Sequence, residues 1–121
     1  MVSQWYQPSG STAAGTFDTV IDPGNDGWAH TGLRIARLAA GESVTIETKG
    51  CEYLVLPLSG GGATVRVGEG DDAIKHHLTG RADMFSAATD LVYVPRDRVL
   101  TVTSDAGGRI AFPYATAAKE F

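Results

Sequence analysis

Short segments in which every second residue is hydrophobic, separated by clusters of turn-forming residues, constrain this chain more than any other feature. Val44 and Ile46, for example, alternate with polar residues. Strand-like segments span residues 17–22, 33–39, 43–48, 52–58, 63–68, 74–78, 91–94, 99–104 and 109–114, and the alternation is clear in several of them. Gly, Asp, Asn and Ser lie between them and favour sharp reversals. A period of two over many short segments predicts an all-β fold, an antiparallel jelly-roll barrel.

The segment YLVLPL, residues 53–58, differs from the others because it is apolar on both faces. Such a strand is typical of the interior of a sheet. Pro57 lacks the N–H that strand pairing uses, so we expect it at a bulge or near the strand end. The glycines of SGGG, residues 59–62, predict a hairpin turn, and GEGDD, residues 68–72, predicts an acidic hairpin tip.

Length and composition indicate a single folded domain. The chain has 121 residues, of which 43% are hydrophobic and 20% charged. We expect an irregular N-terminal arm with the first strand at about residues 1–30 and a barrel core at about 31–114. Trp5, Tyr6 and Trp28 in the arm are expected to cap the barrel or to pack against a partner domain.

The net charge and the lack of a targeting pattern limit which cellular locations and which partners are expected for this chain. A net charge of −4 and scattered arginines argue against a nucleic-acid partner. The chain shows no signal-peptide pattern and no apolar run near the ~20 residues that a membrane span needs. Cys51 is the only cysteine, so no intrachain disulfide can form. We therefore expect a cytoplasmic protein with no membrane partner.

Four phrases of the chain carry a resemblance to a known family. CEYLVLPLSGG, TVRVG, LTGRADMF and LVYVPRDRVLTVTS resemble the N-terminal half of 5-deoxyglucuronate isomerase of inositol catabolism, a two-barrel cupin related to the uronate isomerase of pectin breakdown. The resemblance runs from about Leu33 to Phe112. It implies a cupin fold, an aldose–ketose isomerase (an intramolecular oxidoreductase), and a divalent metal in a second, C-terminal barrel that would be this chain's partner. It also implies a homo-oligomer.

The cupin metal motifs lack their histidines in this sequence. When the first motif is placed from Gly41, its two histidine positions hold Glu47 and Lys49, and Glu52 follows. In the second motif Leu100 occupies the histidine position. Lysine carries no lone pair near neutral pH and leucine offers no ligand atom. We therefore expect neither a metal site nor a catalytic residue in this chain, and no cofactor of its own.

The histidines and the cysteine offer little alternative chemistry. His76 and His77 are adjacent, so on a strand they point to opposite faces and do not bind one ion together. His30 has no second nitrogen ligand at a suitable spacing. Cys51 precedes an apolar strand and is expected to be a small buried hydrophobe. We expect these four residues to have structural or surface roles.

Three residues remain as candidates for binding a sugar-acid substrate. Arg96 follows a strand in VPRDR and could bind a carboxylate, although a solvated or interface role fits it as well. Glu47 and Lys49, two apart on an expected strand, share one face and could pair with each other. The alternatives to an isomerase half are a structural, oligomer-forming cupin module and a free-standing small-molecule barrel whose pocket is lined by Thr45, Glu47 and Lys49.

Overall fold

The computed structural model describes residues 17–21 and 30–118, which form antiparallel β strands joined by short turns. The arm residues Trp5, Tyr6 and Trp28 lie outside this described part. The strands are β1 (Phe17–Ile21), β2 (Thr31–Leu38), β3 (Ser43–Glu47), β4 (Cys51–Gly60), β5 (Ala63–Val67), β6 (Ile74–Leu78), β7 (Val92–Val94), β8 (Val99–Ser104) and β9 (Gly108–Thr116). A 3₁₀ turn, η1, spans Gly70–Asp72. None of the described residues belongs to a helix long and apolar enough to cross a membrane.

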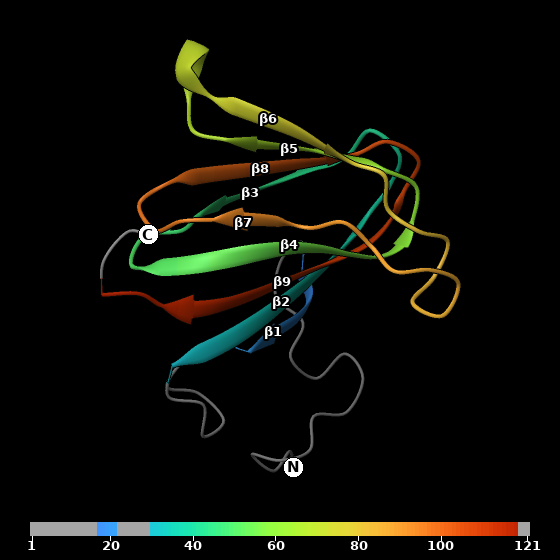
Figure 1. The fold of residues 1–121 in the computed structure, drawn as a ribbon, viewed down its shortest axis with the longest axis horizontal. Helices are drawn as coiled ribbons and strands as arrows, with labels where there is room; N and C mark the ends of the chain where they lie inside the picture. The colour runs from blue at the N-terminus through green and yellow to red at the C-terminus, as the bar shows by residue number, and fades with distance from the viewer. Residues whose placement is uncertain (1–16, 22–29, 119–121) are drawn as a thin grey trace.

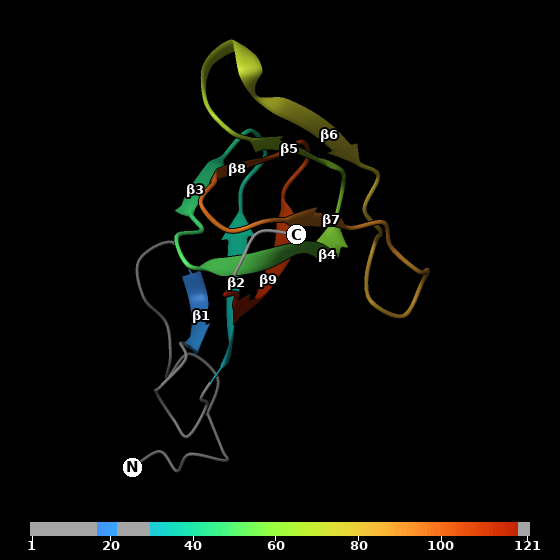
Figure 2. The ribbon, with the colours of Figure 1, turned by 60° about the vertical axis from the view of Figure 1, so that its left-hand side comes forward.

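The strands form two sheets that face each other like the walls of a flattened barrel (Figure 1, Figure 2). Sheet I has the order β1-β2-β9-β4-β7, and sheet II has the order β3-β8-β5-β6. Because β9 pairs with both β2 and β4, the C-terminal strand closes the middle of sheet I. Strands distant in sequence are thus neighbours, as a jelly roll requires.

The apolar core lies between the two sheets, and period-two alternation explains its composition. In sheet II, Ile46, Leu100 and Val67 lie side by side across β3, β8 and β5. Sheet I contributes the largest fully buried side chain, Phe112, on β9. In β3, β4, β7 and β8 the inward residues are buried while most of their strand neighbours face outward, so each of these strands gives one face to the core. Burial of apolar area contributes about 25 cal/mol per Å² and is the main force holding the sheets together.

The strand predictions and the fold class are confirmed by the structure. Every segment predicted as a strand contains an observed strand, with differences only at the ends. The apolar strand β4 lies inside sheet I between β9 and β7, as predicted. The register of β4 against β9 shifts between Pro57 and Ser59, so the proline sits at the expected irregularity. GEGDD forms the expected hairpin tip, with η1 between the paired strands β5 and β6.

The prediction for SGGG is wrong in one respect, because this turn does not join a hairpin. β4 pairs with β9 and β7, whereas β5 pairs with β6 and β8, so the chain passes from sheet I to sheet II at residues 59–62. Gly60 has a φ of 95° and lies against the backbone of Gly107, where a Cβ atom would overlap the carbonyl oxygen. The glycines are needed for this close backbone approach and for the positive φ.

Candidate functional site

A cavity of about 430 Å³ opens at the end of the barrel where β3 ends and β4 begins. Its walls come from both sheets, and its lining mixes charged, hydroxyl and aromatic side chains. The lining residues are Arg34, Thr45, Ile46, Glu47, Thr48, Lys49, Cys51, Tyr53 and Tyr114. The volume falls in the range of about 300–1,000 Å³ that is usual for small-molecule sites. This cavity is the candidate binding site of the barrel.

The structure places Glu47 and Lys49 at this cavity, together with Thr45. Glu47 is the last residue of β3, and Lys49 lies in the following turn with a φ of 50°. The expectation that Glu47 and Lys49 share a strand face is therefore wrong, because the strand ends between them. Both side chains are exposed. Their shared position at the cavity is nevertheless the one expected for a pocket lined by Thr45, Glu47 and Lys49.

Arg34 is a charged residue of the cavity that was not predicted from the sequence motifs. It lies on β2 at the same parity as Ala36 and Leu38, which are buried in the core, so its side chain is directed between the sheets. Its Cζ atom lies 5.4 Å from the ring centroid of Phe17 and 5.4 Å from that of Tyr114. The sequence signal was an arginine at an inward position of an otherwise apolar strand face.

The aromatic residues around Arg34 hold one another in place. The rings of Tyr53 and Tyr114 stack with centroids 4.6 Å apart and an interplanar angle of 14°. The Tyr114 hydroxyl donates to the Ile21 carbonyl oxygen at 3.3 Å, which connects β9 to β1. Arginine packs favourably on aromatic faces, and such contacts restrict its rotamers. The guanidinium therefore has a defined position at the cavity wall.

Arg96 does not line this cavity. Its Nη1 donates to the Ala117 carbonyl oxygen at 2.6 Å, and its Nε donates to Asp97 Oδ2 at 3.0 Å. The backbone N–H of Asp97 donates to the Lys49 carbonyl oxygen at 2.8 Å, so the turn at Arg96 is tied to the turn at Lys49. These contacts give Arg96 a part in fixing the chain after β9, and its binding of a substrate carboxylate stays a prediction.

The residues at the cupin ligand positions do not fit a metal. Leu100 is 0% exposed in the apolar core. Lys49 lies in the exposed turn, and Glu52 lies on the outer face of sheet I, where its Oε2 accepts a hydrogen bond from the Tyr93 hydroxyl at 2.8 Å. Glu47 and Glu52 thus belong to different surfaces. A metal centre needs several donor atoms that converge on one point, and these four positions do not supply them.

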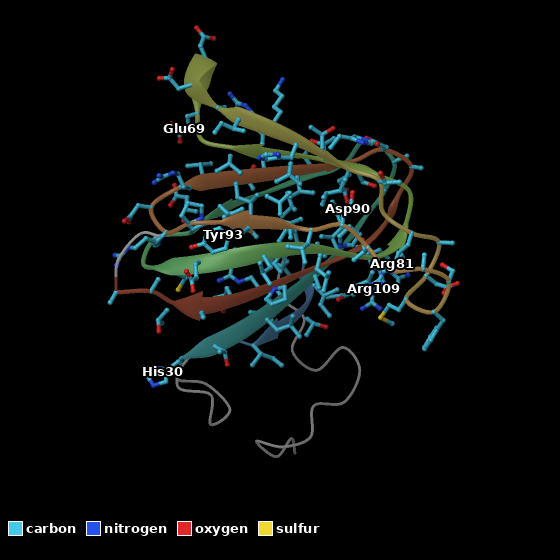
Figure 3. The ribbon with its side chains drawn as sticks, in the orientation of Figure 1. His30, Glu69, Arg81, Asp90, Tyr93 and Arg109 are labelled. Carbon is cyan, nitrogen blue, oxygen red and sulfur yellow. The ribbon has the colours of Figure 1, made fainter. Side chains whose placement is uncertain are left out.

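The remaining candidate ligands are also dispersed. His77 Nε2 and Asp105 Oδ2 are 2.7 Å apart at the surface, and Figure 3 shows His30 near the outer end of β2. Cys51 is half-buried and packs against the core. Residues 17–21 and 30–118 contain no group of three His, Cys, Asp or Glu side chains that could hold a metal ion.

The segment between β6 and β7 is organised by Arg81 and Asp90 (Figure 3). Arg81 Nε donates to the Pro57 carbonyl oxygen at 3.2 Å, and its Nη1 donates to that of Ala87 at 3.0 Å. The Thr79 backbone N–H donates to Asp90 Oδ2 at 2.8 Å and is the main cause that lowers the pKa of Asp90 below its ordinary value. These contacts are structural and lie away from the cavity.

A second cavity, of about 470 Å³, lies on the outer face of sheet I. Its lining is mainly apolar and comes from β2, β4, β7 and β9. The lining residues are Thr31, Gly32, Leu33, Glu52, Tyr53, Leu54, Tyr93, Pro113, Tyr114 and Ala115. Tyr93 is 42% exposed here (Figure 3). We call the outward-facing apolar residues Leu33, Leu54, Tyr93, Pro113 and Ala115 the sheet I patch.

Comparison with known proteins identifies the family. The model of the KduI/IolB family matches residues 5–121. The fold is similar to that of an IolB-like protein from Salmonella typhimurium LT2, with a TM-score of 0.75 and 24% identity over 91% of this chain and 41% of that chain. It is also similar to the Cnp3 cupin domain of Schizosaccharomyces pombe, with a TM-score of 0.59 and 14% identity over 83% of this chain and 63% of that domain's chain. A comparison with curated proteins finds no match.

These similarities agree with the sequence motifs and with the two-sheet architecture. The chain spans less than half the length of the IolB-like structure. The resemblance inferred from CEYLVLPLSGG and VYVPRD is confirmed, and so is the cupin jelly roll. The chain belongs to the KduI/IolB family and has the cupin fold.

Proposed function

We propose that this chain is the N-terminal, metal-free cupin barrel of a 5-deoxyglucuronate isomerase, which converts 5-deoxyglucuronate into 5-dehydro-2-deoxygluconate. The family match supports the reaction class. The main support for a metal-free role comes from Leu100. It occupies the position of a cupin histidine and is 0% exposed in the core. Its register neighbours on the two adjacent strands, Ile46 and Val67, are aliphatic as well.

The chemistry of the reaction explains why a second barrel is needed. An aldose–ketose isomerisation moves a proton between neighbouring carbons while the adjacent carbonyl is polarised. A divalent metal polarises a carbonyl oxygen effectively. The described residues of this barrel do not bring together the donor atoms for such a metal, so in our proposal the metal belongs to a C-terminal cupin domain. This chain then contributes packing surface but no catalytic residue.

The sheet I patch is the surface proposed to meet that partner domain. On a sheet with one solvated face, outward positions are usually polar. Here Leu54 and Pro113 face outward on neighbouring interior strands, and Tyr93 extends the apolar surface onto β7. An apolar surface of this kind is typical of an interface. In the absence of the partner domain, the same patch is expected to drive self-association of the chain.

Activity measurements test the proposal directly. We expect the 121-residue chain to show no metal-dependent turnover of 5-deoxyglucuronate in a coupled assay, and we expect turnover when the same barrel is joined to a histidine-bearing C-terminal barrel of the family. Turnover by the 121-residue chain with added Mn²⁺ or Zn²⁺ would overturn the metal-free role. Lack of turnover by the joined protein would overturn the assigned reaction.

The partner surface has its own test. Light scattering of the 121-residue chain should show oligomers that grow with concentration. Leu54→Lys places a charge in the sheet I patch and should shift the chain toward monomer. Ser43→Lys adds the same charge to an exposed position of sheet II and is the matched control. Monomers of the unchanged chain at every concentration, or equal effects of the two variants, would contradict the assignment of this surface.

A free-standing small-molecule barrel is the second candidate function. The observation in its favour is the cavity that contains Thr45, Glu47 and Lys49. The two functions differ in what the barrel does by itself: a purely structural half has no ligand, whereas a binding barrel takes up a small molecule without any partner domain. Calorimetric titration of the 121-residue chain with small organic acids separates them.

A further inference from the structure

We propose that two copies of this chain form a dimer in which Phe85 of each copy enters the apolar cavity on the outer face of sheet I of the other. The inference goes beyond the proposed isomerase role, because it needs neither a metal nor a C-terminal barrel. It shares with that role only the sheet I patch, which here is the receiving surface. Its basis is the exposure of Phe85, the turn that carries it, and the places of the loop and the cavity along β4.

The loop between β6 and β7, residues 79–91, presents a fully exposed aromatic side chain. Phe85 is 94% exposed, and Met84 beside it is 53% exposed. Figures 1 and 2 both show this loop extending from the barrel next to the end of β4. Buried aromatic side chains dominate the energetics of protein interfaces, and a few such anchors carry most of the binding energy. Phe85 therefore has the chemistry of an anchor for an apolar cavity of a protein partner.

Hydrogen bonds give the turn around Phe85 a defined shape. The Phe85 backbone N–H donates to Asp83 Oδ1 at 2.8 Å, and the Ser86 hydroxyl donates to the Asp83 carbonyl oxygen at 3.0 Å. Arg81 connects the start of the loop to the Pro57 carbonyl oxygen at 3.2 Å. An anchor that is ordered before binding loses less conformational entropy on association. The loop is therefore suited to enter a cavity that already exists.

The cavity on the outer face of sheet I suits an aromatic side chain. Its volume of about 470 Å³ lies in the range of sites that enclose whole small molecules, so a phenylalanine ring fits inside it. Leu54 and Pro113 supply aliphatic walls, and Tyr93 supplies a ring against which a second ring can stack. This chain thus contains both an exposed apolar anchor and an apolar cavity of matching chemistry.

The loop and the cavity belong to opposite ends of β4. The hydrogen bond from Arg81 places the loop near Pro57, whereas Glu52 and Leu54 near the start of the strand line the cavity. A two-fold rotation that reverses the direction of β4 brings the loop of each copy to the cavity of the other. Both contacts then form together, and neither a loop nor a cavity is left for a third copy. The assembly therefore closes as a dimer.

The area of the two contacts fits a dimer that dissociates on dilution. An aromatic side chain buries about 150–250 Å² and covers a similar area of the surface that receives it, so two reciprocal contacts bury about 600–1,000 Å². Met84 and the rest of the sheet I patch bring the total toward the ~1,200 Å² at which stable interfaces begin. With an interface of this size, the loss of one ring from each copy is expected to have a large effect.

Analytical ultracentrifugation of the 121-residue chain tests the anchor. The average mass should rise with concentration and level off at two chains. Phe85→Ser keeps the backbone hydrogen bond to Asp83 but removes the ring from both contacts, so it should weaken the dimer by about 10-fold or more. Ile74→Ser is the matched control, because Ile74 is 59% exposed on β6 and does not line the cavity. This control should leave the dimer unchanged.

A mixing experiment tests whether the contact is reciprocal. Phe85→Ser lacks the anchor but keeps the cavity, whereas Leu54→Lys keeps the anchor but places a charge in the cavity. A dimer of either variant contains no complete contact, whereas a mixed dimer contains one. Native mass spectrometry of the mixture should therefore show mixed dimers well beyond their statistical share. The double variant Phe85→Ser/Leu54→Lys forms no complete contact with the unchanged chain, so that pair should give no mixed dimer.

A second measurement keeps the inference testable if a variant does not fold. In a mixture of ¹³C-labelled and unlabelled copies of the unchanged chain, isotope-filtered NOE spectra should show contacts between the Phe85 ring of one copy and Leu54 of the other. A dimer without such contacts would overturn the inference.

The variants also separate this inference from the proposed function. Equal dimerisation of Phe85→Ser and the unchanged chain would overturn the inference, and a dimer lost in Leu54→Lys alone would still support the sheet I patch as an interface. Absence of mixed dimers would overturn the reciprocal arrangement. If Phe85→Ser kept the dimer but no longer bound a histidine-bearing C-terminal barrel, the loop would belong to the contact with that domain, and the inference would be wrong.

Discussion

Leu100→His is the substitution that tests most directly how this barrel differs from a metal-binding cupin. It restores the histidine that the second cupin motif has at this position. Leu100 is 0% exposed and lies between Ile46 and Val67 in the register of sheet II. The new imidazole would therefore enter an aliphatic layer of the core, with apolar neighbours on both adjacent strands.

The cost of this substitution follows from the burial of Leu100. The leucine side chain contributes about 1.5–3 kcal/mol to folding through full burial, and this contribution is lost. A buried imidazole without hydrogen-bond partners adds about 1–3 kcal/mol of desolvation cost. Together these effects predict a loss of about 2.5–6 kcal/mol in the free energy of unfolding, which is a large share of the 5–15 kcal/mol typical of domains.

Urea unfolding followed by circular dichroism gives the required free energies. Leu100→Met, which nearly conserves volume, is the control and should cost less than about 1.5 kcal/mol. Added Zn²⁺ should not restore the stability of Leu100→His, because Lys49 and Glu52 are directed to other surfaces and supply no further ligand to the core. If Leu100→His matched Leu100→Met in stability, or if Zn²⁺ stabilised it strongly, the conclusion that position 100 belongs to the apolar core and not to a metal site would be wrong.

Three further predictions concern packing, a buried hydroxyl and pH. Gly32→Ala places a methyl group into the Tyr114 ring and 2.6 Å from a backbone carbonyl oxygen. We expect this overpacking to cost about 1–3 kcal/mol of stability and therefore to lower the melting temperature clearly. An unchanged melting temperature would contradict this close packing. Thr48→Val deprives the Arg98 backbone N–H of its hydroxyl acceptor at 2.8 Å and should cost about 1–3 kcal/mol in urea unfolding, whereas a neutral result would show that the hydroxyl is dispensable. Because backbone hydrogen bonds lower the pKa of Asp90, its contribution is present above its ordinary value of 3.8 and is lost as pH falls through the folded value. NMR signals of the segment between β6 and β7 should change in that acidic range, and Asp90→Asn should abolish the transition; an identical transition in the variant would assign it to another group.

The strands and the faces of their residues follow from local alternation. The hydrophobic period of β3 and β8 predicted which residues enter the core, and the missing N–H of Pro57 predicted the irregularity in β4. These features depend on neighbours one or two residues away, so the linear sequence contains the information for them. The family resemblance also comes from short contiguous segments such as CEYLVLPLSGG, so it can be found in the linear sequence.

The choice of strand partners depends on contacts between distant segments. Nothing near residues 59–62 indicates that β4 and β5 join different sheets, because this depends on β9, a distant strand that pairs with both β2 and β4. The hydrogen bond from Arg96 to Ala117 links residues on two different turns. Arg96 follows a strand, as predicted, but its partner Ala117 is 21 residues away, and no local pattern connects the two.

The cavity shows the same division between local pattern and tertiary structure. Glu47 and Lys49 were selected from the sequence because a motif aligned them, whereas Arg34 became visible only when the barrel brought β2 beside β9 and opposite β3. Alternation by itself determined that Arg34 points to the side of Ala36. Only the tertiary structure shows that this side is a cavity wall with aromatic rings around the guanidinium. The physical reason is that long-range strand pairing brings groups that are far apart in sequence within contact distance.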